Sequence, residues 1–290
     1  MIYAIFCADL HLRSTVPECR NDDYQAAQWK KVTWLRHLQE LHECDVLCAG
    51  DVFDTWHSPL SLVLRAVQAL PQNFYFVAGQ HELPYHRFDR WTDGPLGFLD
   101  WSVGRQLVQG ISGPNFPIWG SSYGQDLPTR EQSREVSVVL AHRMFWSKDK
   151  PYPSAPDEGS AERFLSQRPD IHTIVTGDNH QPFVIRNGKQ LFVNCGSMTR
   201  MSVDQADYKP GVWLWDGEDV TFEPYPIEED VVDTVRHIER KERDERVADF
   251  VEKLGNTEVT LNFAENLRRK LDLSDLPKRV KDMVWRCFDE

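Results

Sequence analysis

Five apolar, strand-like segments of this 290-residue chain are each followed by side chains that can bind a metal ion. The segments are residues 1–8, 45–49, 73–78, 135–141 and 172–176, and the side chains that follow them are Asp9 and His11, Asp51 and Asp54, Gln80 and His81, His142, and Asp178 and His180. In open α/β sheets, ligands bind at the carboxyl ends of the parallel strands. We therefore predict a fold in which these five strand ends share one edge.

The segments between and after these strands indicate the fold class. Residues 24–42 and 59–70 have apolar positions at helical spacing and alternate with the first three strands, which is typical of a largely parallel sheet covered by helices. Residues 183–194 and 211–223 each place an Asn-Gly or Asp-Gly pair between two apolar runs, a strong hairpin signal. We predict an α/β protein with two mixed sheets packed face to face and flanked by helices.

The pattern changes near residue 228. Residues 228–255 are highly charged and place apolar residues at helical spacing, and two more amphipathic stretches follow. We predict one domain over residues 1–227 and a small helical appendage over residues 228–290. The appendage is interpreted either as a docking element for a partner or as a cap on its own chain.

Composition limits the compartment and the partners. The N-terminus lacks the basic region and cleavage site of a signal peptide, and no apolar run approaches the ~18 residues of a membrane span. The six cysteines form no CxxC pair, so we expect reduced thiols in a cytoplasmic protein with no membrane contact. The net charge of −12 argues against broad electrostatic capture of nucleic acid, although bound cations would offset a cluster of carboxylates locally.

The side chains at the strand ends suit a pair of divalent cations. Carboxylates and imidazoles together bind manganese, iron or zinc, and two such cations can hold a phosphate and activate a water. Each motif alone has a simpler explanation: a Gly-Asp pair after a strand is usually a turn, and a lone His142 is more often a core histidine. The ordered set favours a metal centre.

Taken in order, the motifs DLH, GDVFD, GQHE, a lone histidine and GDNH resemble the series DxH, GDxxD, GNH[DE], H and GHxH of the calcineurin-like metallophosphoesterases. The resemblance covers about residues 1–225. The segments LCAGDVFDTWHSPL and VNCGSMTRMSVDQADYKPGVWLW are similar to those of SbcD-type double-strand-break-repair nucleases, of which a 290-residue chain resembles a compact or phage-like member. Protein phosphatases of the superfamily carry GDxVDRG instead, and its arginine is absent here.

The resemblance implies a role for each matched residue. One metal would be held by Asp9, His11, Asp51 and His180, and the second by Asp51, Gln80, His142 and Asp178, with Asp51 bridging. His81 would be the general acid that protonates the departing sugar oxygen, and Asp54 would orient it. Glu82 matches the acidic position of the third motif.

Two residues depart from the family pattern. Gln80 stands where the family has asparagine, and Asp178 stands where it has the first histidine of GHxH. Both keep an oxygen ligand, and an added carboxylate favours manganese or magnesium over zinc. We expect an active site with altered metal preference; the alternative is a weak or empty second site.

Several basic residues are candidates for substrate contact. Arg87 and Arg90 lie among aromatics in residues 84–91, which suits either a DNA-contacting loop or an ordinary packed loop. Arg200 is a candidate phosphate contact or a surface ion pair. His57 and His86 follow motifs and could touch substrate, or be solvent-exposed loop histidines.

The sequence thus predicts a manganese-dependent DNA exonuclease and endonuclease that acts in repair or recombination. No Walker A motif is present, so the resemblance implies an SbcC-like coiled-coil ATPase as partner, and the chain is a possible homodimer. The acidic charge favours the first alternative, a phosphoesterase for a small nucleotide or a phosphoprotein. The second alternative is a catalytically weakened scaffold.

Overall fold

The structure, a computed structural model, describes residues 1–102, 104–106, 111–112, 115–148, 150, 159–227, 231–233, 235 and 263–289. The chain divides into two compact units, Met1–Thr234 and Val235–Glu290. The boundary predicted from the sequence lies after residue 227. No helix in the described part is long and apolar enough to cross a membrane.

The first sheet of the large unit has six strands in the order β12-β11-β1-β2-β3-β4. Their bounds are β1 Ala4–Cys7, β2 Asp45–Cys48, β3 Phe74–Phe76, β4 Gly104–Gln106, β11 Gly211–Trp215 and β12 Val220–Pro224. Strands β1 to β4 run parallel, while β11 and β12 pair antiparallel with their neighbours. The helices that return the chain between the first parallel strands are α1 (Tyr24–His42) and α2 (Leu60–Ala69), and α3 (Pro95–Ser102) precedes β4.

The second sheet also has six strands, in the order β5-β6-β7-β8-β10-β9. Their bounds are β5 Ile111–Ser112, β6 Ile118–Ser121, β7 Val138–His142, β8 Thr173–Gly177, β9 Phe183–Asn187 and β10 Gln190–Asn194. Strands β6, β7, β8 and β10 are parallel, and α4 (Ala161–Gln167) lies between β7 and β8 in sequence. Both predicted hairpins are present: β9 pairs with β10 and β11 with β12, around Gly188 and Gly217 at positive φ.

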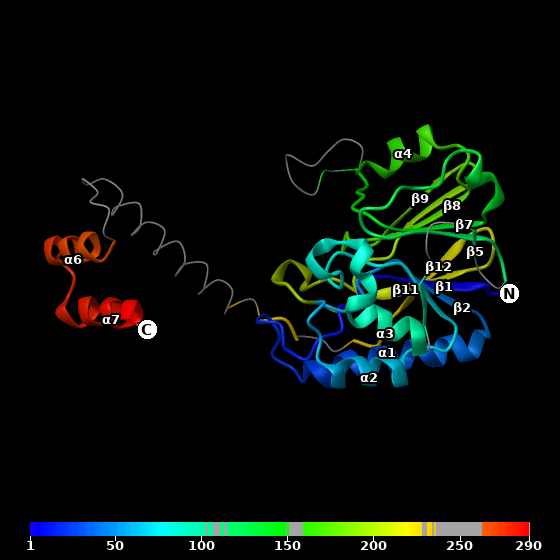
Figure 1. The fold of residues 1–290 in the computed structure, drawn as a ribbon. Coiled ribbons are helices and arrows are strands. Elements are labelled where there is room, and N and C mark those ends of the chain that lie inside the picture. Colours follow the sequence, from blue (N-terminus) through cyan, green and yellow to red (C-terminus); the bar gives the residue numbers. More distant parts are fainter. Residues whose placement is uncertain are drawn as a thin grey trace. The chain divides into compact units, whose positions relative to one another are not determined.

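The side chains of a strand alternate between its two faces, and this places each sheet between a layer of helices and the other sheet. In β1, Ile5 and Cys7 pack with the helices α1, α2 and α3, whereas Ala4 and Phe6 face the second sheet. Successive side chains of a strand point to opposite faces, so a strand buried on both faces is a continuous apolar run. A third cluster joins the second sheet to α4. Figure 1 shows α1 to α3 on one side and α4 on the other. Two mixed sheets packed face to face and flanked by helices were predicted, and this fold is confirmed.

Helix α1 shows how local sequence sets its ends. The side chain of Asp23 accepts a hydrogen bond from the Ala26 N–H at 3.0 Å, which caps the first turn, and Glu43 ends the helix in the left-handed region. Its inner face buries Trp29, Val32 and Leu35.

The C-terminal unit contains helices α6 (Phe263–Leu273) and α7 (Lys278–Asp289), as predicted for the appendage. Leu267 and Leu271 are buried, and Arg268 lies over the ring of Trp285. The expected helix from residue 228 is wrong at residues 231–233. Val231 is buried and Val232 forms an antiparallel bridge with Arg20, so these residues are extended. Most of the expected 228–255 helix lies outside the described residues.

Candidate metal centre

Ligand-type side chains from five strand ends meet at one place. Strands β1, β2 and β3 are parallel in one sheet, and β7 and β8 are parallel in the other. Three groups have ligand atoms within 4.8 Å of one another: Asp9 with His11 and His180, His11 with Asp51 and His81, and Asp9 with Asp51 and His142. The sequence predicts this convergence, because the carboxyl ends of parallel strands share an edge.

The loops that carry these residues have uncommon backbone conformations. Asp9, His11, Asp51 and Asp178 all have positive φ, between 44° and 76°. Non-glycine residues rarely adopt this region, and each such residue costs on the order of 1–3 kcal/mol. The surrounding contacts must hold them there, and such outliers gather at functional sites.

Two glycines allow close approach of the loops. A Cβ on Gly50 would lie 2.2 Å from Nδ1 of His142, and a Cβ on Gly79 would lie 2.0 Å from Oδ1 of Asp51. Gly50 also has a φ of +96°. The first contact joins a loop of one sheet to a strand of the other, so the two sheets can meet at the site only if position 50 lacks a side chain.

The first side of the centre is formed by Asp9, His11 and His180. The two histidines face each other, with their Nε2 atoms 3.1 Å apart. Both carboxylate oxygens of Asp9 accept from the backbone N–H of Asp178, at 3.1 and 3.2 Å. This bond fixes Asp9 and places the β8 loop against the β1 loop.

The second side contains His142, Gln80 and Asp178. The Oε1 atom of Gln80 lies 2.6 Å from Nε2 of His142, and the Gln80 amide nitrogen donates to Oδ1 of Asp178 at 2.7 Å. Gln80 therefore reaches both other residues despite its extra methylene. Nδ1 of His142 donates to the Ala49 carbonyl at 2.7 Å, which leaves Nε2 facing the centre.

The ionisable side chains of the centre shift one another's pKa values. Burial raises the pKa of Asp9 to about 7 and, together with nearby His11, lowers the pKa of His180 to about 4. Burial alone would lower the pKa of His142, but the Asp51 carboxylate raises it well above its usual value. Burial opposes ionisation of Asp51, and the neighbouring His142 nevertheless holds its pKa well below the usual range. The Asp51 carboxylate thus stabilises positive charge on the buried His142, as it would stabilise a bound cation.

The residues present fit divalent cations. Oδ2 of Asp51 is buried and accepts no hydrogen bond from the described residues, while Nε2 of His142 lies 3.4 Å away and Nε2 of His11 3.8 Å away. A buried carboxylate oxygen without a donor is costly unless a ligand satisfies it. Carboxylate, imidazole and amide donors are the set that manganese and related metals accept.

His81 and Asp54 lie beside the centre, but in a different relation from the one expected. Nδ1 of His81 is 3.1 Å from the backbone carbonyl of Asp54, so the main chain orients the ring. The Asp54 carboxylate instead lies 3.5 Å from Nδ1 of His11 and 3.4 Å from Arg13. Nothing in the sequence marks Arg13 except its position two residues after His11.

Glu82 ties two of the loops together. Its fully buried carboxylate accepts from the backbone N–H of Phe53 at 2.7 Å and of Gly79 at 3.0 Å. Burial raises the pKa of Glu82 to about 8. These bonds hold the β2 and β3 loops in register at the site.

The basic candidates lie in different surroundings. Arg87 and Arg90 are at the surface and pair with Asp89 at 2.6 Å and with Asp93 at 2.8 Å. Arg200 is buried, and its Nη1 donates to the Ala206 carbonyl. The alternative of a surface ion pair assumed an exposed Arg200, and this is wrong, because the side chain is buried beside a pocket that it shares with Lys31 of α1 and with Pro226.

The loop histidines His57 and His86 are exposed. Nδ1 of His86 lies 3.1 Å from the Gln80 carbonyl, and its ring is 6.4 Å from that of Tyr123. Tyr123 in turn is 6.5 Å from the ring of His142. Tyr123 follows β6 and was not singled out from the sequence, since no motif marks it.

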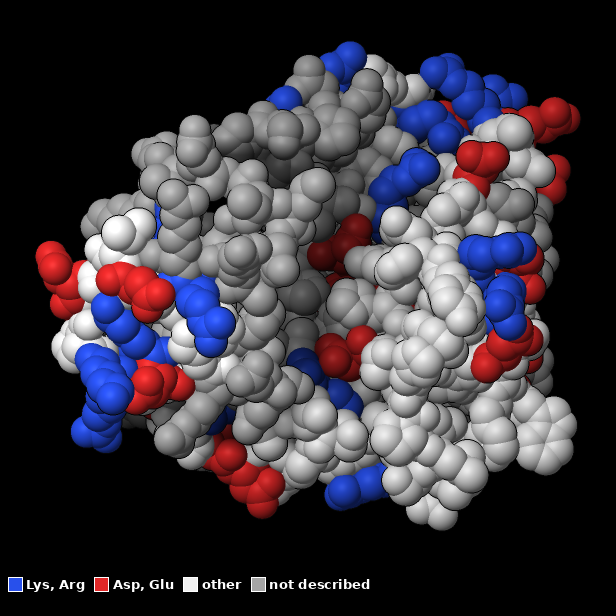
Figure 2. Space-filling model, turned by 60° about the vertical axis from the view of Figure 1, so that its left-hand side comes forward, with Lys and Arg blue, Asp and Glu red and all other residues white. Residues whose placement is uncertain are grey.

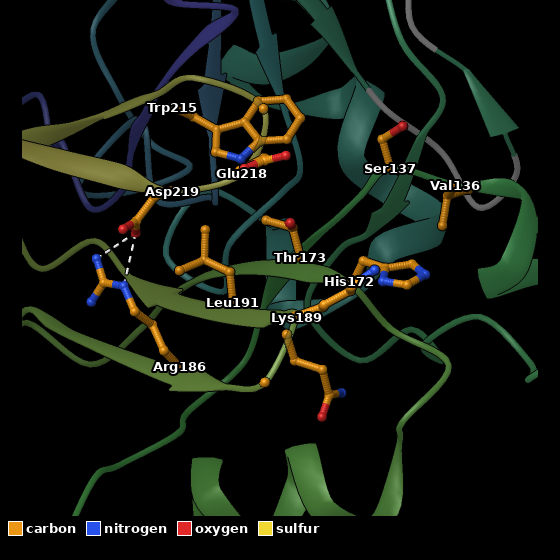
Figure 3. Close-up of a pocket in the computed structure, with 13 residues that line it drawn as sticks. Val136, Ser137, His172, Thr173, Arg186, Lys189, Leu191, Trp215, Glu218 and Asp219 are labelled. Carbon is orange, nitrogen blue, oxygen red and sulfur yellow. Dashed lines mark hydrogen bonds and ion pairs between the residues drawn. The ribbon is translucent and has the colours of Figure 1, made fainter.

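A separate cavity of about 610 Å³ lies away from the candidate ligands. It is lined by the residues just before β7, by the start of β8 and by the turns of both hairpins, with Trp215 above Leu191 and Thr173 and with Arg186 paired to Asp219 (Figure 3). It carries two basic and two acidic side chains and none of the predicted ligands, so its size does not make it the chemical site.

The surface charge matches the acidic composition. On the face drawn in Figure 2, basic and acidic side chains of the described residues are interspersed, without a broad basic patch among them. Strong electrostatic capture of a polyanion needs many unpaired cations. Any nucleic-acid binding by the described residues of this face must depend on other contacts.

Comparison with known proteins gives one informative match. The family model described as calcineurin-like phosphoesterase matches residues 3–182, more than half of the chain. No curated protein matches the sequence.

The chain is similar to many solved structures, among them the following three. An archaeal phosphodiesterase shares 8% identity with a TM-score of 0.41, covering 76% of this chain and 98% of its own. A candidate 5′-nucleotidase from Staphylococcus aureus, in complex with α-ketoglutarate, shares 14% with a TM-score of 0.43, covering 83% and 58%. A protein from Thermus thermophilus shares 9% with a TM-score of 0.46, covering 77% and 98%. Likeness at this level adds nothing to the functional argument.

Proposed function

This chain belongs to the calcineurin-like phosphoesterase family, and from that premise we propose that it is a manganese-dependent nuclease that hydrolyses phosphodiester bonds in DNA. The observation that carries the proposal is the meeting of ligand atoms from five strand ends in two sheets. A metal-dependent phosphoester hydrolase follows from the family; the diester and the DNA are the proposed parts.

The residues divide naturally between two cations. Asp9, His11 and His180 would hold one, and His142, Gln80 and Asp178 the other, with Asp51 between them. Asp9, like Asp51, belongs to two of the three groups, so it is a second candidate for the shared ligand. When bound, such a pair of cations supplies charge stabilisation to a phosphoester and lowers the pKa of a water. Manganese is favoured because Asp178 and Gln80 provide oxygen donors where the family pattern has nitrogen or a shorter amide.

His81 is positioned to transfer a proton to the leaving oxygen. The Asp54 carbonyl is an acceptor for an N–H at Nδ1 of His81, so the ring is held with Nε2 free for the substrate. The His81 side chain is exposed. It belongs to one of the three groups of side chains whose ligand atoms lie within 4.8 Å of one another. A general acid in this place contributes typically about 10²–10⁴-fold to the rate.

The preference for DNA rests on the SbcD-like segments around residues 48–60 and 193–215. Arg87 and Arg90, near His81 in sequence, would contact the substrate, although each has an aspartate partner. We propose Arg200 as a support for the 196–200 turn. An SbcC-like ATPase in repair or recombination would supply the ATP use that this chain lacks, and the appendage after residue 227 would dock it or cap the domain.

One experiment separates the candidate functions. The manganese-loaded protein is incubated with plasmid DNA, with single-stranded DNA and with a chromogenic bis-ester. Cleavage of DNA supports the nuclease. Intact DNA beside a cleaved ester would reject it and support the small-substrate phosphoesterase, which the acidic charge favours. Fewer than one bound manganese per chain by elemental analysis would support the scaffold alternative.

A further inference from the structure

Two aromatic side chains stand next to each other where two loops of the candidate centre leave it. Trp56 follows Asp54 by two residues, and Tyr85 follows His81 by four. Their ring centroids are 5.2 Å apart at an interplanar angle of 46°. Tyr85 is 65% exposed, and Trp56 is half-buried. We call Trp56 and Tyr85 the aromatic ledge.

The ledge adjoins His81 because the two loops are bonded together. The Asp54 carbonyl meets Nδ1 of His81 at 3.1 Å, and the Glu82 carboxylate binds the N–H groups of Phe53 and Gly79. Residues 53–56 and 81–85 therefore leave the centre side by side. A group attached to the oxygen that His81 would protonate could extend along these two loops to the ledge.

Tyr85 is exposed to an extent that its packing does not explain, while Trp56 is half-buried. The two rings are not stacked face to face on each other, since the angle between them is 46°. One neighbour covers each ring: His57 lies 3.3 Å from Trp56 by centroids, and the Arg90 guanidinium lies 5.5 Å from Tyr85. Most of Tyr85 still faces solvent, and its φ of +53° places it in a strained conformation.

The chemistry of the ledge suits a nucleobase. Aromatic rings bind bases of any sequence through their π-faces, and a nearby guanidinium adds to the stacking. Arg87 and Arg90 are neutralised by Asp89 and Asp93, so phosphate attraction there is weak. In a chain with a net charge of −12, stacking provides substrate affinity that does not require a basic surface.

We propose that Trp56 and Tyr85 stack on the base of the leaving nucleoside, the one whose sugar oxygen receives the proton from His81. The inference rests on the proposed nuclease function and adds to it a specificity: the enzyme reads the presence of a base on the leaving side of the cleaved bond.

The test uses the full chain loaded with manganese and single-stranded hexathymidylate. Six further strands each carry one abasic sugar, at each position in turn. Mass spectrometry gives the rate at every bond, and the product end without phosphate identifies the leaving side. For wild-type protein, an abasic sugar on the leaving side should lower kcat/KM at that bond about 5- to 150-fold, the equivalent of ~1–3 kcal/mol of stacking.

Two variants and a control locate the effect. Trp56→Ala and Tyr85→Ala should each reduce the ratio of base-containing to abasic cleavage toward one, and both are checked for folding by thermal unfolding. Trp101→Ala should keep the wild-type ratio, because Trp101 is 82% exposed on α3 and belongs to neither loop.

The possible failures are distinguishable. If strands are cut but leaving-side abasic sugars make no difference, the ledge proposal is overturned and the nuclease stands. A dependence on the retained-side base instead also overturns it. If no strand is cut at any bond, the proposed function fails and the ledge proposal fails with it.

Discussion

Replacing Gly50 with alanine tests how the two sheets meet at the centre. The new Cβ would lie 2.2 Å from Nδ1, 2.6 Å from Cγ and 2.9 Å from Cβ of His142, on a backbone with a φ of +96°. His142 must move, because all three contacts are far inside van der Waals distance. Its bond to the Ala49 carbonyl would be lost, and Nε2 would leave the position that faces Gln80.

Two reference variants separate the contributions to the free energy of unfolding that Gly50→Ala is expected to lose. Gly124→Ala has a similar φ of +76° but nothing within 4 Å, so it measures backbone strain, at ~1–2 kcal/mol. Gly79→Ala has no positive φ but places a Cβ 2.0 Å from Oδ1 of Asp51, so it measures contact, at ~1–3 kcal/mol. Gly50→Ala combines strain, contact and a lost hydrogen bond of ~1 kcal/mol, for a total of ~3–6 kcal/mol.

The assay is urea unfolding of the three variants, followed by manganese titration calorimetry at a temperature where each is folded. This loss leaves a domain of typical stability, ~5–15 kcal/mol, folded unless its stability lies at the lower end of that range. Gly50→Ala should bind fewer manganese ions than wild type, whereas Gly124→Ala should bind the same number. If Gly50→Ala is no less stable than Gly124→Ala and binds the same number of ions, the close approach of the β2 loop to His142 is not what builds the site.

Three further predictions follow from individual residues. His81→Ala should lower DNA cleavage about 10²–10⁴-fold and leave the manganese stoichiometry by calorimetry unchanged; retained turnover would remove His81 from the acid role. Asp178→His should raise the affinity for zinc relative to manganese in competition titrations, because a neutral nitrogen replaces an anionic oxygen; an unchanged ratio would place Asp178 outside the ligand set. Burial lowers the pKa of Lys31 from 10.5 to about 7. The folded state therefore binds fewer protons than the unfolded state between these values, and stability rises with pH across that window. In urea unfolding, Lys31→Met should be more stable relative to wild type at pH 7 than at pH 10, by on the order of 3 kcal/mol, and a pH-independent difference would contradict this.

Strand positions and their terminal residues could be predicted because both signals are local. Residues 1–8 form an apolar run in every position since β1 is buried on both faces, and Asp9 comes directly after it. Parallel pairing then brings Asp9 and Asp51 to one edge without any knowledge of packing. Contacts across the two sheets are different, because they depend on how the sheets are placed. The bond from His142 to the Ala49 carbonyl and the approach of Gly50 have no sequence signal.

Side-chain orientation was the less predictable part of the site. Asp54 was expected to orient His81, and it does so through its carbonyl, while its carboxylate contacts His11 and Arg13. A motif specifies which residue is present. It does not specify whether the backbone or the side chain of that residue binds a given neighbour. The burial of Arg200 was missed for a different reason: an arginine after a turn is usually at the surface, and its burial here depends on α1 and on Pro226, which lie far from it or later in the sequence.

The two departures from the family pattern compensate each other. Asparagine to glutamine at position 80 lengthens the side chain, and histidine to aspartate at position 178 shortens the opposite one. The Gln80 amide spans the resulting space, with its oxygen 2.6 Å from His142 and its nitrogen 2.7 Å from the Asp178 carboxylate. The amide and the carboxylate therefore satisfy each other, and each keeps an oxygen that could bind a cation. We propose a working second site with altered metal preference, and manganese titration of the wild-type protein tests it against the scaffold alternative.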